Sequence, residues 1–312
     1  MNAEDERVCP LCGGHGRARF VQYNFHIVRC TECEHEFVLE QPLPNHQATV
    51  YGDDYFFGGG AGYSDYLAES KLLTAKGEWY AQVLSKQILP GTILDVGAAA
   101  GFVLKGFTNH GWKGAGIDPN PTMVQYGVQR LELDLKCGSL ESLSELLPTR
   151  TFHLICFIQV LPHLYDLRAA LSHAYQATLP GGYWLMETWR RDSWTAWCTG
   201  RYWHEYSPPS VLHWFTKRGL LKLCESFGMQ YVSSGRPKKR IQGEHLRSIL
   251  TYKAKELPLG KLLEKGLTWI PSNAEFPYPA EDLMWMLVRK PERESNRDSR
   301  LQPEDDESSR LT

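Results

Sequence analysis

The chain of 312 residues lacks any apolar run near the roughly 20 residues that a membrane-spanning helix requires. Its first residues, 1–7, are acidic and have no apolar core, so we expect no secretory signal and a cytoplasmic protein. An excess of one charge is lacking too, because the net charge is −2, which argues against a protein built mainly to hold nucleic acid. The apolar fraction of 42% is typical of a folded globular protein.

Cysteine is well represented, with eight residues, four of which form two C-x-x-C pairs. The pairs are Cys9–Cys12 and Cys30–Cys33, and 17 residues separate them. This separation falls in the range of structural zinc sites. Two such turns bring four thiolates together as a closed tetrahedral set, which has a folding role and no open position for catalysis.

Thiol exchange is the alternative function of a C-x-x-C pair. Two evenly spaced pairs without a surrounding βαβ unit favour the metal. His15 and His35 are candidate substitute ligands beside a set that is already complete. We expect the remaining cysteines to be packing residues in a reduced protein: Cys137, Cys156, Cys198 and Cys224.

Residues 93–101, Ile-Leu-Asp-Val-Gly-Ala-Ala-Ala-Gly, are the most informative stretch of the chain. An apolar run ends at Asp95 and turns through small residues into an amphipathic segment, which predicts a buried strand, a tight turn and a helix start. A second apolar run, 114–118, closes on Asp118. Such a pair of parallel strands is expected to bind a nucleoside across its carboxyl ends.

The charge of the turn indicates which nucleoside. A dinucleotide fingerprint, G-x-G-x-x-G, keeps acids out of the turn because a pyrophosphate binds at the helix N-terminus. Here Gly97, Ala99 and Gly101 follow another spacing, and Asp95 would repel phosphate and attract a cation. We therefore expect S-adenosylmethionine, which carries a sulfonium and an α-ammonium, with Asp118 bonded to the ribose hydroxyls. A βαβ unit without a ligand is the alternative.

Further motifs follow in order along the chain: Phe-His-Leu-Ile at 152–155, Gln-Val-Leu-Pro-His-Leu at 159–164 and Leu-Pro-Gly-Gly at 179–182. With Asp95–Gly101 they resemble the motifs of class I S-adenosylmethionine-dependent methyltransferases, from which Ala99, His153, Gln159 and Pro162 depart. The resemblance implies a Rossmann-like, doubly wound α/β sheet, mostly parallel with an antiparallel last strand. It also implies cofactor contacts from Asp95, Gly97, Ala99, Gly101, Asp118, Pro119, Ser139, Leu140 and Gln159.

Methyl transfer from a sulfonium depends on alignment, and a base is needed only where the acceptor must lose a proton. Candidates for this base are His163 after the fourth strand, Glu187, which we expect to face the cleft, and His204 and His213 in the aromatic segment 201–215. That segment resembles a cap of small-molecule methyltransferases. The hypothesis is that His204 or His213 removes an acceptor proton while tryptophans exclude water; the alternative is that these histidines only order the loop.

Composition divides the chain into a zinc ribbon at 1–42, an aromatic linker with a helix at 43–90, a methyltransferase domain at 91–290 and a disordered tail at 291–312. We expect the domain to contain a cap at about 190–215 and a helical insertion at about 241–270. Residues 51–66 combine tyrosines with glycines, which favours either a lid over the site or an aromatic strap packed on the domain.

The sequence thus predicts methyl transfer to an O or N centre of a small molecule, such as a sugar or secondary metabolite. A C-methyltransferase for nucleotide sugars stays open, because such enzymes resemble this chain in their N-terminal cysteine module. A zinc-ribbon RNA methyltransferase would need a basic face, for which 236–240 is the dense basic cluster. An inactive interaction protein that retains the fold is the third class. The sequence does not indicate an oligomeric state.

Overall fold

A computed structural model of the chain describes residues 8–40, 46–58, 65–243, 247, 251, 271, 274–278 and 280–292. The expected disordered tail, the glycines at 59–62 and most of the expected helical insertion at 241–270 lie outside the described residues. At the start of that insertion, residues 241 and 242 belong to a strand, whereas residues 243, 247 and 251 are helical. Residues Lys239–Gln242 form a strand, β11, which pairs with β12 at Glu275–Tyr278.

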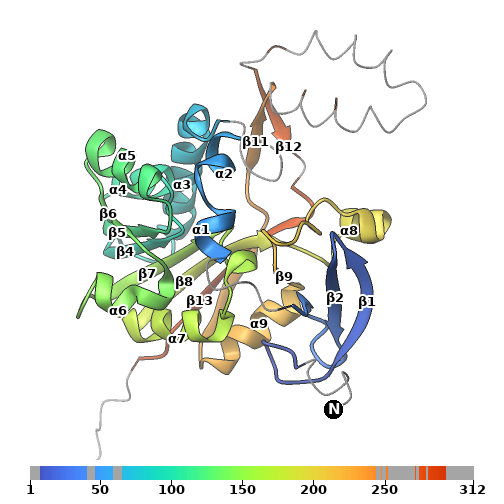
Figure 1. Cartoon of the computed structure of the whole chain (residues 1–312). Coiled ribbons are helices and arrows are strands. Elements are labelled where there is room, and N and C mark those ends of the chain that lie inside the picture. Colours follow the sequence, from blue (N-terminus) through green and yellow to red (C-terminus); the bar gives the residue numbers. More distant parts are fainter. Residues whose placement is uncertain are drawn as a thin grey trace, which may run out of the picture.

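Seven strands form the central sheet, in the order β10-β13-β8-β7-β4-β5-β6 (Figure 1). The strand β13 runs antiparallel to both of its neighbours, and the pairs among β8, β7, β4, β5 and β6 are parallel. The predicted Rossmann-like methyltransferase sheet is therefore confirmed. The strand bounds are β4 Thr92–Val96, β5 Lys113–Asp118, β6 Asp134–Cys137, β7 Phe152–Ile158, β8 Thr178–Trp189, β10 Gln230–Gly235 and β13 Leu283–Arg289.

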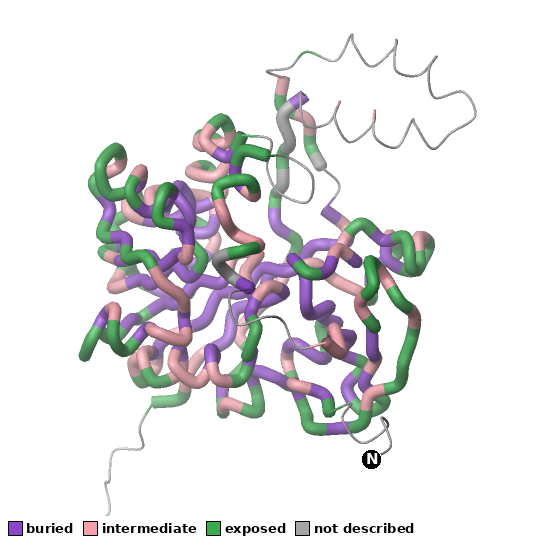
Figure 2. The backbone as a smooth tube through the Cα atoms, viewed as in Figure 1, coloured by how far each residue is buried: buried purple, intermediate pink, exposed green. Residues whose placement is uncertain are grey.

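The middle strands are buried on both faces because helices cover the sheet from either side (Figure 2). Apolar residues therefore occupy successive positions in β4 and β7, as parallel strands require. The helices are α3 Ser70–Leu84, α4 Phe102–Thr108, α5 Pro121–Leu131, α6 Leu143–Leu146, α7 Leu167–Ala177 and α9 Lys217–Ser226, with short 3₁₀ turns at Leu67–Glu69, Leu140–Ser142, Leu161–His163 and Gly200–Tyr202. No described helix is both long and apolar enough to cross a bilayer.

Local chemistry explains where several helices begin and how closely two of them pack. The side chains of Asn120, Asp166 and Thr216 each accept a backbone N–H in the first turn of their helix. Helices α3 and α4 come into backbone contact where Gly77 and Gly106 face each other. A β-carbon on Gly77 would lie 2.1 Å from the carbonyl oxygen of Val103, so only glycine permits this approach.

The N-terminal strands and the cap belong to one small sheet, in the order β1-β2-β3-β9. Strands β1 Gly16–Gln22, β2 Phe25–Cys30 and β3 Glu36–Val38 come from the ribbon, and β9 His213–Trp214 comes from the cap, which also holds helix α8 Trp194–Thr199. Figure 1 shows β1 and β2 beside α8 and apart from the helices around β4–β6. Ile27, Trp203 and Trp214 share one buried cluster, so the two segments that composition separates fold against each other.

Candidate functional site

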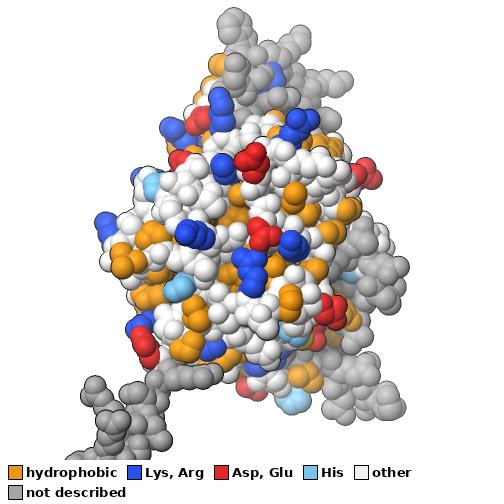
Figure 3. All heavy atoms as spheres, turned by 90° about the vertical axis from the view of Figure 1, so that its left-hand side faces the viewer, with side chains coloured by type: hydrophobic (Ala, Val, Ile, Leu, Met, Phe, Trp, Pro, Cys, Tyr) orange, Lys and Arg blue, Asp and Glu red, His pale blue; other side chains and the backbone are white. Residues whose placement is uncertain are grey.

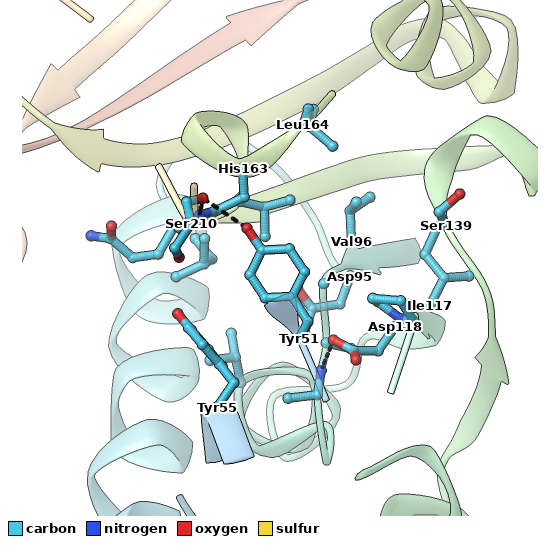
Figure 4. Close-up of a pocket in the computed structure, with 18 of the residues that line it drawn as sticks. Tyr51, Tyr55, Asp95, Val96, Ile117, Asp118, Ser139, His163, Leu164 and Ser210 are labelled. Carbon is cyan, nitrogen blue, oxygen red and sulfur yellow. Dashed lines mark hydrogen bonds between the residues drawn. The ribbon is translucent and has the colours of Figure 1, made fainter. Parts of the chain in front are cut away.

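A cavity of about 350 Å³ lies at the carboxyl ends of β4, β5 and β7 (Figure 4). One half is lined by the turn after β4 and by the residues after β5 and β6. The other half is lined by the aromatic segment, by the start of the segment after β7 and by the cap. The short helix α2 Asp53–Phe57 provides Tyr55 and Phe56 on this side, and another short helix, α1 His46–Val50, precedes it. Tyr51, Tyr55, Phe56 and Tyr66 reach the cavity, so the stretch 51–66 contributes to its wall.

Asp95 and Asp118 both reach the cavity from neighbouring strands and are almost completely buried. Asp118 accepts the backbone N–H of Ala99 at 2.8 Å on one oxygen and that of Asn120 at 2.9 Å on the other. Burial raises the pKa of Asp118 to about 6. Burial and the charge of Asp118 raise the pKa of Asp95 to about 7, and its Oδ2 has no hydrogen-bond partner within the described part of the chain.

The residues expected to contact the cofactor fall into a group that lines the cavity and a single residue, Gly101, that lies behind the cavity wall. Gly101 does not line the cavity, and with a φ of 83° it caps the N-terminus of α4. Ala99 keeps the left-handed backbone of the glycine that it replaces in the motif, with a φ of 48°. The lining group is Asp95, Gly97, Ala99, Asp118, Pro119, Ser139, Leu140 and Gln159.

His163 is the one base candidate that lines the cavity. Its Nδ1 donates a hydrogen bond to the carbonyl oxygen of Ser210 at 2.7 Å, and the hydroxyl of Tyr51 donates to the same oxygen at 2.8 Å. Because a carbonyl only accepts, the proton of the neutral ring lies on Nδ1 and Nε2 keeps its lone pair. Burial lowers the pKa of His163, which favours this neutral form.

Glu187 differs from expectation, because it lies behind the cavity wall and does not line it. Its side chain is fully buried and accepts hydrogen bonds from Lys76 at 2.6 Å, from Gln159 at 2.8 Å and from the hydroxyl of Tyr80. Burial works against the charged form, but Lys76 outweighs it and lowers the pKa of Glu187. The carboxylate thus fixes Lys76 and Gln159, which do line the cavity.

His204 and His213 also lie away from the cavity lining. His204 is on the outer side of the cap, 3.4 Å from Glu205, with its ring against Trp189. His213 lies on β9, which pairs with β3, and this pairing buries its side chain. Its Nε2 donates a hydrogen bond to the carbonyl oxygen of Leu164 at 3.0 Å, and its Nδ1 lies 3.2 Å from Nε2 of His35. Burial lowers the pKa of His213 to about 4. The predicted cap segment thus reaches the cavity, but neither of these histidines is among the residues that line it.

Several cavity residues were not anticipated. Lys76 reaches the cavity from α3, and Glu205, Ser207 and Ser210 reach it from the cap. Glu205 stands in the same titratable and aromatic stretch as His204, and that stretch was the available signal. For Lys76 the sequence offers no signal beyond its place on an amphipathic helix.

The four paired cysteines form a compact cluster in the ribbon. Their sulfur atoms all lie within 4.8 Å of one another, with Cys9 and Cys33 at 3.5 Å and Cys12 and Cys30 at 3.4 Å. Sulfur atoms around a tetrahedral Zn²⁺ are about 3.8 Å apart, so the donor set fits this ion. His15 is outside the cluster, and His35 contacts His213 instead.

The sheet order, the two acids at neighbouring strand ends and the cysteine cluster define a class I S-adenosylmethionine-dependent methyltransferase fold with a small N-terminal zinc ribbon. Residues 69–234 match the model of the family described as Methyltransferase domain, and the chain belongs to this family.

Curated relatives match over part of their length. The ubiquinone biosynthesis O-methyltransferase of Rhodopseudomonas palustris (strain BisB18) is 27% identical over 105 residues, which are 32% of this chain and 40% of that protein. The enzyme of the same name from Bradyrhizobium sp. (strain ORS 278) is 26% identical over 130 residues, which are 40% of this chain and 48% of that protein. The chain thus spans less than half of the length of these relatives.

Solved structures are similar at lower identity. The 1,6-didemethyltoxoflavin-N1-methyltransferase of Burkholderia thailandensis has a TM-score of 0.49 and 14% identity, with 88% of this chain and 100% of that chain covered. A methyltransferase of Archaeoglobus fulgidus has a TM-score of 0.47 and 17% identity, with 72% and 99% covered.

Proposed function

We propose that this S-adenosylmethionine-dependent methyltransferase transfers the methyl group to an O or N centre of a small molecule. The observation that carries the proposal is the pair of buried carboxylates, Asp95 and Asp118, which reach one cavity from neighbouring strand ends. S-adenosylmethionine supplies an electrophilic methyl group on a sulfonium. The relatives named as O-methyltransferases favour a small acceptor of this kind.

Asp95 is proposed to bind the α-ammonium of the donor. Its Oδ2 is buried without a partner, and a buried polar atom of this kind is costly unless a ligand group satisfies it. Asp118 is proposed to accept the ribose hydroxyls, because each of its oxygens receives one backbone N–H and keeps a second lone pair. Ser139 and Leu140, which line the cavity after β6, are proposed to flank the adenine.

His163 is proposed as the base for an acceptor that must lose a proton. The free lone pair on its Nε2 would take the proton as the acceptor atom bonds to the methyl carbon, while the carbon–sulfur bond breaks and its electron pair stays on the sulfur, which becomes a neutral thioether. The Nδ1–H bond to Ser210 holds the ring in one orientation and stabilises the imidazolium that results. The cavity wall formed by Tyr51, Tyr55 and Trp189 keeps water from the reacting atoms.

Cys9, Cys12, Cys30 and Cys33 are proposed to hold one structural zinc ion. Backbone N–H groups of Leu11 and Glu32 point at the sulfur atoms of Cys9 and Cys30 at 3.4 Å, which stabilises thiolates. The site is closed by four protein ligands, so we assign it to folding and not to chemistry.

Calorimetric titration with S-adenosylmethionine tests the donor site and separates an enzyme from an inactive interaction protein. The wild-type chain is expected to bind the donor, and Asp118→Ala is expected to weaken binding by at least about tenfold through lost hydrogen bonds. Asp134→Ala, on the edge strand β6 and outside the cavity lining, is the matched control. An absence of heat for the wild-type chain would refute the proposal.

A further inference from the structure

The cap carries three large aromatic side chains that are exposed on the surface of the molecule. Trp194 and Trp197 on α8 are 71% and 74% exposed, and Tyr202 in the following 3₁₀ turn is 79% exposed. The two indole rings meet edge to face, with their centroids 5.5 Å apart. Single exposed apolar residues are ordinary, but three within the segment 194–202 form an aromatic patch of the kind that marks an interaction surface.

Helix α8 is fixed to the protein from its inner side. The carboxylate of Glu281 accepts the backbone N–H groups of Trp194 at 3.0 Å and of Thr195 at 3.1 Å. Ala196 is buried in the cluster that also contains Trp203. The helix contains no charged residue, so its outer face offers a partner the contact area of two indoles and no ionic group.

A second hollow, of about 560 Å³, lies between α8 and the ribbon. Trp194 and Trp197 line it from α8, and Arg19, Arg29 and Arg191 line it from β1, β2 and the start of the cap. Figure 1 shows the same arrangement, with β1 and β2 beside α8. The aromatic patch and a group of arginines therefore belong to one surface.

Positive charge is in excess at this hollow. Arg19 and Arg191 approach the same oxygen of Glu36, at 3.2 Å and 3.4 Å, and Glu36 is fully buried. Two guanidinium groups thus share one carboxylate. The Nε of Arg191 is buried and has no hydrogen-bond partner within the described ranges. An acidic ligand group in the hollow would compensate the remaining positive charge.

The acids that line the hollow do not cancel this excess. Glu34 pairs with Arg29, and Asp192 pairs with Arg190 at 3.3 Å. The lining residues and their ion-pair partners thus comprise four arginines and three carboxylates. Arg201, exposed after α8, adds a further positive charge. The whole chain, by contrast, has a net charge of −2.

Two arginines also face each other across the ribbon. Arg17 on β1 lies directly opposite Arg29 on β2, so both side chains project from the same face of the ribbon. Arg17 makes no ion pair within the residues that the structure describes. Like charges opposite each other destabilise a pair of strands, and an anionic surface would relieve this repulsion.

We infer that the aromatic patch and the arginines around the hollow dock on a membrane surface that contains anionic lipids. Trp and Tyr side chains concentrate at the level of the lipid headgroups, and arginines near an anionic leaflet strengthen binding. The contact is peripheral, with the two indoles inserted at the boundary between the headgroups and the acyl chains. This inference goes beyond the proposed function and does not depend on it.

Membrane docking is favoured over two other occupants. Single-stranded RNA stacks its bases on aromatic rings along a basic groove. Here the two indole planes stand at 87° to each other, and the helix that carries them has no charged residue. A second copy of the chain would have to bring like charges together, because a two-fold interface joins the same patch of both copies.

Sedimentation of the full chain with lipid vesicles tests the inference. Vesicles of phosphatidylcholine mixed with phosphatidylglycerol supply the anionic surface, and vesicles of phosphatidylcholine alone are the uncharged comparison. We expect binding to the anionic vesicles to be at least about tenfold stronger, because each arginine at such a surface strengthens binding about fivefold. Added salt should weaken binding to the anionic vesicles, because it screens the attraction.

Two double variants separate the aromatic from the electrostatic part of the surface. Trp194→Ser/Trp197→Ser should lower the partition into anionic vesicles at least about tenfold through lost apolar burial. Leu89→Ser, at a position that is 84% exposed in the loop after α3, is its matched control. Arg17→Gln/Arg201→Gln should lower binding about fivefold for each arginine replaced. Arg130→Gln, exposed on α5, is the second control.

Both double variants should keep the melting temperature and bind S-adenosylmethionine with a Kd within about twofold of wild type. If the wild-type chain does not sediment with anionic vesicles, or if either double variant binds them like wild type, the inference is overturned. Binding to single-stranded RNA or self-association that the same variants abolish, without vesicle binding, would assign the surface to another occupant and overturn the inference as well. Donor binding is measured separately, so each of these outcomes leaves the proposed function standing.

Discussion

At the residue scale, burial disfavours the charged forms of Asp95 and Asp118, and a bound cation would favour them. Their pKa values of about 7 and about 6 lie above the ordinary value of 3.8 because both are buried. A cationic donor favours the ionised forms, so we expect the affinity for S-adenosylmethionine to rise from pH 5 to pH 8, by up to about tenfold per pH unit for each group. Titration calorimetry across this range, with Asp95→Asn giving a shallower profile, checks the prediction.

The stability of the ligand-free protein should respond to pH in the opposite direction. A carboxyl whose pKa is raised on folding stabilises the folded state below its unfolded pKa, and this contribution is lost as pH rises through the folded pKa. For Asp95 and Asp118 the loss falls between about pH 4 and pH 7. Urea unfolding of wild type and Asp95→Asn at pH 5 and pH 8 should show a smaller decline with pH in the variant. An equal decline would count against charge suppression at Asp95.

His163→Asn is designed to separate the two ring nitrogens of this histidine. The asparagine amide can still donate to Ser210 in place of Nδ1, but no lone pair replaces Nε2. We expect kcat to fall by a factor of about 10²–10⁴ with the Kd for S-adenosylmethionine unchanged. His153→Gln, exposed on β7 and outside the cavity, is the matched control. Turnover within threefold of wild type would show that positioning alone carries the reaction.

At the scale of elements, the ion pair of Lys76 and Glu187 ties α3 to β8 behind the cavity. Lys76→Met would leave the fully buried carboxylate of Glu187 without its counter-charge, and this type of change costs about 3–5 kcal/mol. We expect urea unfolding to shift accordingly, and the double variant Lys76→Met/Glu187→Gln to recover part of the loss. Lys71→Met, exposed on the same helix, should change little. Equal stability of Lys76→Met and Lys71→Met would contradict the prediction.

The strands and helices of the core could be predicted because residues close together in the sequence indicate each of them. The strand 152–158 is a continuous apolar run, and α5 starts at a proline after Asn120. The pairing of β3 with β9 could not be predicted, since it joins residues about 180 positions apart and β9 is only two residues long. The strand β11 was missed for a similar reason, because β11 and its partner β12 lie more than 30 positions apart in the chain.

At the scale of the whole molecule, the two halves of the cavity differ in how far the sequence reveals them. The half proposed to bind the donor (the donor half) is built from one strand–turn–helix unit and the next strand end, so a motif of nearby residues indicates it. The half proposed to bind the acceptor (the acceptor half) is assembled from Tyr51 and Tyr55, His163 and the cap around Glu205 and Ser210, which meet only in the folded chain. Figure 3 shows basic and acidic side chains interspersed on one face of the molecule.

We expect the zinc ribbon to stabilise the acceptor half of the cavity without lining it. His35, two positions after Cys33, contacts His213, and His213 donates to the carbonyl oxygen of the cavity residue Leu164. Atomic emission should find one zinc ion per chain. The variant Cys33→Ser should lower the melting temperature by several degrees and should unfold in a single transition, because the ribbon and the cap share a sheet. The acceptor KM should rise while the Kd for S-adenosylmethionine changes little, since the ribbon pairs with β9 of the cap, whereas the half proposed for the donor is built at the ends of β4, β5 and β6. Cys198→Ser, exposed in α8, is the control. A separate low-temperature transition with an unchanged acceptor KM would show that the ribbon folds independently of the site.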